Sequence, residues 1–310
     1  MQPVIAPIDR NVLELELSPD RFIRTTNKGT NQIYIINCNN APNVLLEIGR
    51  VREITFREAG GGTGKDCDLD PFDSGPIPYE QLIVWNPVDK EIVGGYRFIR
   101  CIEALNAGLV STHLATSELF SFSNQFVKSY LPKTIELGRS FVQPQYQPNN
   151  DNRKGLFSLD NLWDGLGAIT VDHPDINYFF GKVTMYRHFN PIARDMILFF
   201  MHHYFPDNDK LVVPFHPLPL LNDMSTFQKE IADLPYKEGH IVLNQHVREL
   251  GENIPPLFNS YMNLSSTMKT FGTAINDHFG EVEETGILVT ISDIYETKKE
   301  RHVSTYSPRR

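Results

Sequence analysis

The run from Glu136 to Val142 (ELGRSFV) constrains the fold most, because it has the pattern of a buried strand yet carries a carboxylate and a guanidinium three residues apart. Charged side chains are rarely buried unless they are paired or used in chemistry. Positions three apart on a strand point to opposite faces. A β-bulge at Gly138 would bring both charges to one side and free a backbone N–H as an oxyanion donor. Two interpretations stay open: a structural ion pair at a strand kink, and a reactive site.

Composition and charge exclude several classes of protein. The chain has 310 residues, of which 41% are hydrophobic and 22% charged, as in soluble globular proteins. No run of 18 apolar residues predicts a transmembrane helix, and residues 1–10 lack the apolar core of a signal peptide. The three cysteines, Cys38, Cys67 and Cys101, are far apart, which fits a reducing cytoplasm. The net charge of −9 argues against nucleic acid as a partner.

An acidic partner would need a local basic patch. Candidates for such a patch are Arg153 with Lys154, and a second group formed by Lys182, Arg187 and Arg194. Scattered solubilising charges are the alternative explanation for each of these residues.

Hydrophobic periodicity predicts strands and helices in alternation. Strands are expected at 31–37, 79–85, 91–100, 134–142, 176–185, 210–215 and 286–294. Helices are expected at 42–59, 159–169, 190–204 and 255–262. Residues 60–78 are rich in Gly, Pro and Asp and predict a long loop, and 216–250 predicts an irregular insertion. This order is typical of an α/β fold with a mixed sheet.

Three tempting motifs fail in detail. The glycine-rich run 60–65 is not a phosphate loop, because Ala59 stands where its first glycine belongs and Asp66 follows the lysine. The acidic run 66–73 lacks the ligand spacing of an EF-hand, which leaves a solvated loop or an active-site lid as its role. His202 and His203 are adjacent on a predicted helix and face different directions. The sequence therefore predicts no metal site.

Four motifs in fixed order carry a family resemblance. They are Val51–Arg57 (VREITFR), Asp70–Asp73 (DPFD), Val93–Ile99 (VGGYRFI) and Glu136–Arg139 (ELGR). This succession resembles the ornithine-lipid and glycine-lipid N-acyltransferases, often called hemolysin-like, which are a branch of the GNAT superfamily. The acyl-homoserine-lactone synthases are similar at a greater distance. The resemblance covers residues 40–205, and a second stretch from 254 extends it to about 294.

The resemblance implies a GNAT-like fold with a mixed, mostly antiparallel central sheet flanked by helices and a C-terminal extension. Residues 1–215 would form the acyltransferase core, and 216–294 an insertion and the C-terminal part of the same domain. Residues 295–310 are expected to form a polar tail that frays.

The family resemblance also implies the reaction. A fatty acyl group, with or without a 3-hydroxyl, would pass from a thioester to the amino group of an amino acid, with glycine favoured and ornithine as the alternative. GNAT enzymes that bind coenzyme A carry a glycine-rich loop after the central strand. Residues 147–155 contain one glycine and one proline instead. This difference favours acyl carrier protein as the donor, with Arg153 and Lys154 binding its phosphate, and no tightly bound cofactor.

The opening motif supplies the predicted catalytic residues. Glu136 is the expected general base, acting directly or through a water. Backbone N–H groups near Gly138 would stabilise the oxyanion. Arg139 would orient Glu136 or bind the pantetheine phosphate.

The other motifs supply the predicted substrate-binding residues. Arg97 would hold the acceptor carboxylate through a bidentate contact. Asp70 and Asp73 would position the ammonium or pair with Arg52 across the cleft, and a salt-bridge cage that orders the loop is the equal alternative. Ser140 is counted with the substrate-binding residues.

An apolar tunnel is expected for the acyl chain. Its predicted lining, which ordinary core packing would explain as well, consists of Phe179, Phe180, Phe199, Phe200, Met185 and Met196. The rival interpretations are an acyl-homoserine-lactone-type synthase and a non-enzymatic membrane-lytic hemolysin. The predicted location is cytoplasmic, with peripheral contact to the inner membrane through the lipid product.

Overall fold

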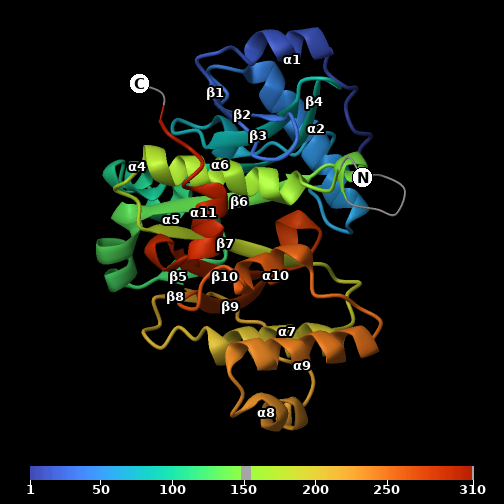
Figure 1. Ribbon diagram of the computed structural model, residues 1–310, viewed down its shortest axis with the longest axis vertical. Helices are drawn as coiled ribbons and strands as arrows, with labels where there is room; N and C mark the ends of the chain where they lie inside the picture. The colour runs from blue at the N-terminus through green and yellow to red at the C-terminus, as the bar shows by residue number, and fades with distance from the viewer. Residues whose placement is uncertain (148–154, 309–310) are drawn as a thin grey trace.

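The computed structural model describes residues 1–147 and 155–308 and is built around one eight-stranded sheet (Figure 1). Its strand order is β1-β2-β3-β4-β6-β7-β10-β9. The strands are β1 (Phe22–Thr25), β2 (Gln32–Ile36), β3 (Glu80–Asn86), β4 (Glu91–Arg100), β6 (Thr134–Val142), β7 (Tyr178–Met185), β9 (Lys269–Asn276) and β10 (Val282–Thr290). A separate two-stranded sheet joins β5 (Phe120–Phe122) to β8 (Val212–Pro214). Arg153 and Lys154, the predicted donor-binding pair, lie outside the described residues.

The sheet is mixed and mostly antiparallel, as the family resemblance implies. Among its named pairs only β6 and β7 run parallel, and their register ends at Leu137 opposite Gly181. Beyond that point β7 pairs only with β10, and β6 only with β4. The parallel pair therefore parts in the middle of the sheet.

Helices cover both faces of the sheet. They are α1 (Arg10–Glu16), α2 (Pro42–Glu58), α3 (Pro71–Ser74), α4 (Cys101–Asn106), α5 (Val110–His113), α6 (Ser158–Asp172), α7 (Pro191–Tyr204), α8 (Ser225–Ile231), α9 (Tyr236–Glu249), α10 (Pro256–Met262) and α11 (Glu296–His302). Figure 1 shows α6 and α11 side by side across one face, which we call the α6 face. The opposite face, packed against α2, is the α2 face.

The α2 helix forms where the sequence predicts it. Pro42 occupies the first turn, where its missing N–H is not needed. Val44, Leu45 and Ile48 repeat at helical spacing and pack against Ile83 and other buried residues of the α2 face.

The α6 helix packs on the opposite face with Leu162 and Leu166, against Leu82 and its neighbours. Gly165 allows this close approach, because a Cβ there would lie 2.7 Å from a methyl group of Leu82. The two helices fix the sheet between two apolar layers, so its central strands are buried on both faces.

Several predicted boundaries are wrong. Residues 216–250 are not irregular, because they contain α8 and the 14-residue helix α9. Residues 210–215 contribute β8 to the small sheet, not to the central one. The final strand begins at Val282 instead of Gly286, and its partner β9, like β1, was not predicted. The expected loop 60–78 includes the one-turn helix α3.

The C-terminal segment also differs from the prediction of a fraying tail. Residues 296–302 form α11, which packs against α6. His302 is buried, and its Nδ1 lies 2.7 Å from a carboxylate oxygen of Asp164. Asn27 donates to the same carboxylate from its backbone and its side chain. A buried polar network therefore fastens the described end of the chain to the fold.

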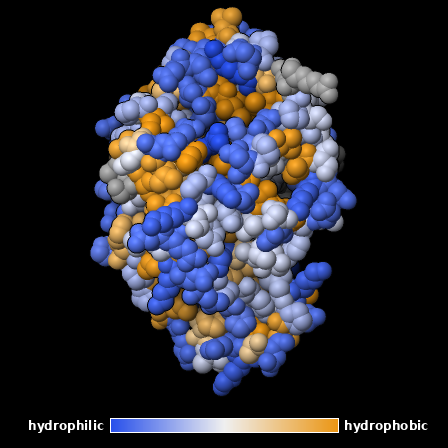
Figure 2. All heavy atoms as spheres, turned by 90° about the vertical axis from the view of Figure 1, so that its left-hand side faces the viewer, coloured by the Kyte–Doolittle hydropathy of each residue, from blue (hydrophilic) through white to orange (hydrophobic). Residues whose placement is uncertain are grey.

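The surface is mixed in character on the side drawn in Figure 2, where hydrophobic residues form separate small patches among hydrophilic ones. Across the described residues, no helix is both long enough and apolar enough to cross a bilayer.

Candidate active site

The predicted bulge exists, one residue beyond the expected position. The pairing of β6 with β4 jumps from Gly138 opposite Arg97 to Phe141 opposite Gly95. Arg139 and Ser140 therefore share the place opposite Tyr96, and Arg139 takes a left-handed φ of 48°. This extra residue interrupts the alternation of side chains between the two faces of the sheet. Arg139 consequently reaches the α2 face, the same face as Glu136, as the sequence predicted.

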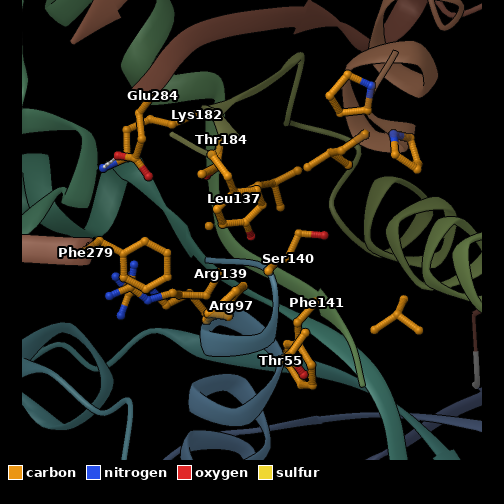
Figure 3. A pocket seen from close by; sticks show the side chains of 18 of the residues that line it. Thr55, Arg97, Leu137, Arg139, Ser140, Phe141, Lys182, Thr184, Phe279 and Glu284 are labelled. Atoms are coloured by element: carbon orange, nitrogen blue, oxygen red, sulfur yellow. Dashed lines mark ion pairs between the residues drawn. The ribbon is translucent and has the colours of Figure 1, made fainter. Parts of the chain in front are cut away.

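A cavity of about 460 Å³ opens where β6 and β7 part. Its wall includes Thr55 and Phe56 of α2 on one face of the sheet. It also includes Leu159 of α6 and Leu257 of α10, which pack on the other face. The cavity thus connects the two faces through an opening between β6 and β7, which we call the aperture. Figure 3 shows the labelled side chains that line the cavity, with Arg97, Arg139 and Phe279 close together on one side of it.

Glu136 is the buried carboxylate of this cavity. Its side chain is 1% exposed and accepts hydrogen bonds from the Tyr79 hydroxyl at 2.5 Å and the Thr116 backbone N–H at 2.6 Å. Burial raises the pKa of Glu136 above its usual range, although these two donors and the Lys182 charge oppose the shift. A carboxylate of raised basicity at a cavity wall has the character of a general base.

Tyr79 was missed in the sequence, because an aromatic residue at the start of a strand is most often core. Its hydroxyl is fully buried, donates to Glu136, and accepts from the Ala115 backbone N–H at 3.0 Å. Burial, and next the nearby Glu136 charge, raise the pKa of Tyr79 well above its usual value. The hydroxyl therefore stays a proton donor that stabilises the Glu136 carboxylate.

Tyr79→Phe tests this contact. Removing the donor destabilises the ionised Glu136, so its pKa should rise further and the rising limb of the pH–rate profile should move to higher pH. The measurement is kcat/KM between pH 5 and 10. A profile that keeps its wild-type midpoint would show that Tyr79 does not tune the base.

A second buried carboxylate lies on β10. Glu284 contacts the Lys182 Nζ at 2.8 Å and accepts from the Asn276 side chain at 3.1 Å. Figure 3 shows Lys182 and Glu284 directed toward each other at one end of the cavity. Burial alone would raise the pKa of Glu284, but the Lys182 ammonium holds it below its usual range. The pKa of Glu136 is raised and that of Glu284 is lowered, so Glu136 is the better proton acceptor of the two carboxylates.

The sequence offered little signal for this pair. Lys182 stood out only as a basic-patch candidate, and Glu284 fell outside the predicted strand. Arg187 and Arg194, the other members of that patch, are paired elsewhere, with Glu281 and with Glu283 respectively.

Three arginines and three aspartates form a cluster beside the cavity, which we call the arginine–aspartate cluster: Arg52, Arg97, Arg139, Asp68, Asp70 and Asp73. Asp73 is fully buried and binds the Arg52 Nη2 at 2.9 Å and the Arg97 Nη1 at 3.2 Å. Asp70 caps α3 and accepts from Arg97 at 2.7 Å. These ion pairs are the contacts expected of a salt-bridge cage, except that Asp70 pairs with Arg97 and Arg139 and not with Arg52. Asp68 belongs to the cluster and was missed.

Arg139 pairs with this cluster and not with Glu136. Its Nε lies 3.1 Å from Asp68, and its guanidinium stacks 4.1 Å from the centre of the Phe279 ring (Figure 3). No contact between Arg139 and Glu136 is found in the described structure. The expectation that Arg139 orients Glu136 therefore lacks a contact to support it.

Arg97 lines the cavity, and its Nε donor is unused. Its Nη1 serves Asp70 and Asp73, whereas its buried Nε has no hydrogen-bond partner among the described residues. That Nε lies beside Gly138, 3.7 Å from where a Cβ on this glycine would stand. Ser140 also lines the cavity, on the opposite side of the aperture, where its hydroxyl meets the Tyr96 hydroxyl.

The predicted tunnel lining is mostly wrong. Phe179 and Phe180 border only a small side cavity of about 20 Å³, and Met185 and Phe200 are packed in the core. Phe199 and Met196 pack against that core from the α7 side. These positions satisfy the apolar pattern of a core equally well, so the sequence could not separate the two. The apolar wall of the cavity comes instead from residues of several elements: Phe56, Leu137, Phe141, Val142, Leu159, Pro255, Pro256, Leu257 and Phe279.

Metal ligation has no support in the described part of the chain, where no group of three or more His, Cys, Asp or Glu side chains could hold an ion.

Comparison with known proteins identifies the family. Residues 51–152 match a family model described as an acetyltransferase (GNAT) domain. The chain is 52% identical to a glycine N(alpha)-acyltransferase of Bacteroides thetaiotaomicron, over 99% of this chain and 91% of that relative. It is 51% identical to a glycine N(alpha)-acyltransferase of Phocaeicola vulgatus, over 99% and 94%. A solved CoA-dependent acyl-homoserine lactone synthase aligns over 89% of both chains with 11% identity and a TM-score of 0.41. The chain is therefore an N-acyltransferase and belongs to the family of the glycine N(alpha)-acyltransferases.

Proposed function

We propose that this enzyme moves a 3-hydroxyacyl group from the phosphopantetheine thioester of acyl carrier protein to the amino group of glycine, in aminolipid biosynthesis. The observation that carries the proposal is the position of Glu136. This buried carboxylate of raised pKa faces the cavity where β6 and β7 part. Both relatives are glycine N(alpha)-acyltransferases, which favours glycine as the acceptor.

The cavity suits two substrates that arrive from opposite faces. The α6 side of its wall is apolar, with Leu159 and Leu257, and suits an acyl chain. The α2 side carries Glu136, Lys182 and Arg97, and suits a small polar amine. The thioester carbonyl would lie in the aperture beside Gly138.

The reaction follows from these positions. Glu136 takes a proton from the ammonium of glycine, and the neutral amine attacks the thioester carbonyl. The carbonyl oxygen becomes an oxyanion, which the free Nε–H of Arg97 and backbone N–H groups near Gly138 are placed to stabilise. Collapse of this intermediate breaks the C–S bond. The protonated Glu136 gives the proton that it took from the ammonium to the leaving sulfur, which departs as the pantetheine thiol. The Glu136 carboxylate then takes the remaining amine proton and releases it to solvent.

The donor assignment rests on sequence. Residues 147–155 lack the glycine-rich loop that binds the coenzyme A pyrophosphate, and the phosphate of acyl carrier protein needs only a small basic site such as Arg153 with Lys154. Because the product is an amphiphile, we place the enzyme in the cytoplasm with peripheral contact to the inner membrane.

A purified-enzyme assay tests the proposal. We expect N-(3-hydroxyacyl)glycine, identified by mass spectrometry, from 3-hydroxyacyl-acyl carrier protein and glycine. The kcat/KM should be at least tenfold lower when ornithine replaces glycine, and also when the acyl-CoA replaces the acyl carrier protein donor. Efficient turnover with acyl-CoA and none with the carrier protein would overturn the donor, and a preference for ornithine would overturn the acceptor.

A further inference from the structure

We propose that Lys182 binds the α-carboxylate of the acceptor amino acid, with Glu284 as the residue that positions it. This inference rests on the proposed function, because it assigns a subsite to the acceptor of that reaction. It replaces the expectation that Arg97 holds the acceptor carboxylate through a bidentate contact.

The contacts of the cations that line the cavity favour Lys182. The Nη1 of Arg97 is taken by Asp70 and Asp73, and Arg139 is paired with Asp68. The two carboxylates already balance the Arg97 charge, and its free Nε lies beside Gly138, where it is placed for the oxyanion and not for the acceptor carboxylate. Lys182 is outside that cluster.

The Lys182 ammonium has capacity for a further partner. Its Nζ contacts Glu284 at 2.8 Å and donates to the Ala115 carbonyl at 3.1 Å. An ammonium carries three N–H donors, and these two contacts account for two of them. The side chain lines the cavity, so the third donor is available to a ligand there.

The sheet places Lys182 on the same face as Glu136. In the parallel register Glu136 is opposite Phe180, so Lys182 is two residues further along on the same face. Gly138 stands level with Lys182 across the aperture. An amino acid lying in front of Gly138 could therefore present its amine toward Glu136 and its carboxylate toward Lys182.

Glu284 makes this arrangement selective. Its buried charge, anchored by Asn276, pairs with Lys182 and fixes the direction of the ammonium. The carboxylate itself repels a substrate anion from its own side of Lys182. The remaining donor then defines a single point for an α-carboxylate.

A comparison of glycine with glycinamide tests the assignment. Glycinamide keeps the amine and lacks the carboxylate charge. In Lys182→Met, kcat/KM for glycine should fall about 10- to 100-fold relative to glycinamide, the size expected for loss of a hydrogen bond between charged groups. Any general effect on Glu136 acts on both acceptors and cancels in this ratio. Glu284→Gln should move the ratio in the same direction through a higher KM for glycine.

The controls separate structure from recognition. Lys269→Met removes an ion-paired lysine of the same sheet that lies outside the cavity, and should leave the ratio unchanged. Lys182→Gln, which retains a donor for Ala115, takes the place of Lys182→Met if the latter fails to fold.

An equal loss for glycine and glycinamide in the Lys182 variant would overturn the assignment while the proposed function stands. Failure of the wild-type enzyme to acylate glycine at all would instead overturn the proposed function, and this subsite with it.

Discussion

Glu136→Gln is expected to lower kcat by about 10²- to 10⁴-fold, the range that a positioned general base contributes. The fold should survive, because the amide oxygen can still accept from Thr116. The Tyr79 hydroxyl can turn its proton to the His113 carbonyl, 3.2 Å away, and accept from the new amide. Turnover of the proposed acyl donor and glycine, measured beside circular dichroism, separates loss of chemistry from loss of fold.

The pH dependence gives a second readout. Wild-type activity should rise with pH as Glu136 ionises, at a pH above the ordinary carboxyl range because burial raises its pKa. The variant should lack this limb. The stability of the fold depends on the same pKa shift. Because the Glu136 carboxyl ionises at a lower pH in the unfolded chain than in the folded protein, its contribution to the free energy of unfolding is lost as pH rises from the unfolded pKa through the folded one. Glu136→Gln should therefore gain stability relative to wild type as pH rises.

Glu80→Gln is the matched control. Glu80 is a half-buried carboxylate at the start of β3 whose pKa is also raised by burial, but it does not line the cavity. Its substitution should leave kcat within about twofold of wild type, in the range of changes away from special sites. Near-wild-type turnover in Glu136→Gln would rule out Glu136 as the base.

Asp73→Asn should destabilise the protein by about 3–5 kcal/mol, the cost of removing one partner from a buried ion pair. The neutral side chain would leave Arg52 and Arg97 buried with too little negative charge around them. We expect the Tm to fall by roughly 5–10 °C. Activity should fall as well, because Arg97 and the loop that carries α3 form part of the cavity surroundings.

Lowering the pH should reduce the difference in stability between the wild-type protein and Asp73→Asn. Burial alone would raise the pKa of Asp73, but Arg52 and Arg97 hold it well below its usual range. Its stabilising contribution is therefore present above the unfolded carboxyl pKa, about 3.9, and is lost as pH falls below it. Asp175→Asn, which breaks an exposed ion pair with Arg100, should cost less than about 1 kcal/mol. If Asp73→Asn costs no more than that control, the cluster is not a structural cage.

Sequence patterns predicted the elements that have a strong local signal. The apolar spacing of α2, the Asn190 cap of α7 and the hairpin of β3 with β4 are all visible in a short window. The α9 helix was missed because its buried stripe is narrow, with Leu243 and Val247 among polar residues. The β9 strand was missed because it is an edge strand interrupted by Gly272.

The residues of the site also fall into two groups, those with a local sequence signal and those without one. Glu136 and Arg139 could be singled out because charges in an apolar strand are unusual. Asp68, Tyr79 and Glu284 could not, because their roles depend on partners that are distant in the chain. Lys182 meets Glu284 only after β7 and β10 pair, across about a hundred residues of sequence. Local patterns thus locate unusual residues, whereas tertiary pairing decides which of them act together.

The aperture between β6 and β7 also bears on kinetic order. A cavity with walls on both faces of a sheet offers two ligands separate places, so in the proposed reaction neither would have to depart before the other binds. In the proposed reaction, acyl donor and amine would then be held together in a ternary complex. The enzyme would need no acyl-enzyme intermediate and no nucleophile of its own. Selectivity for the chain and selectivity for the amine would also be separable, because changes on the α6 side leave the α2 side in place.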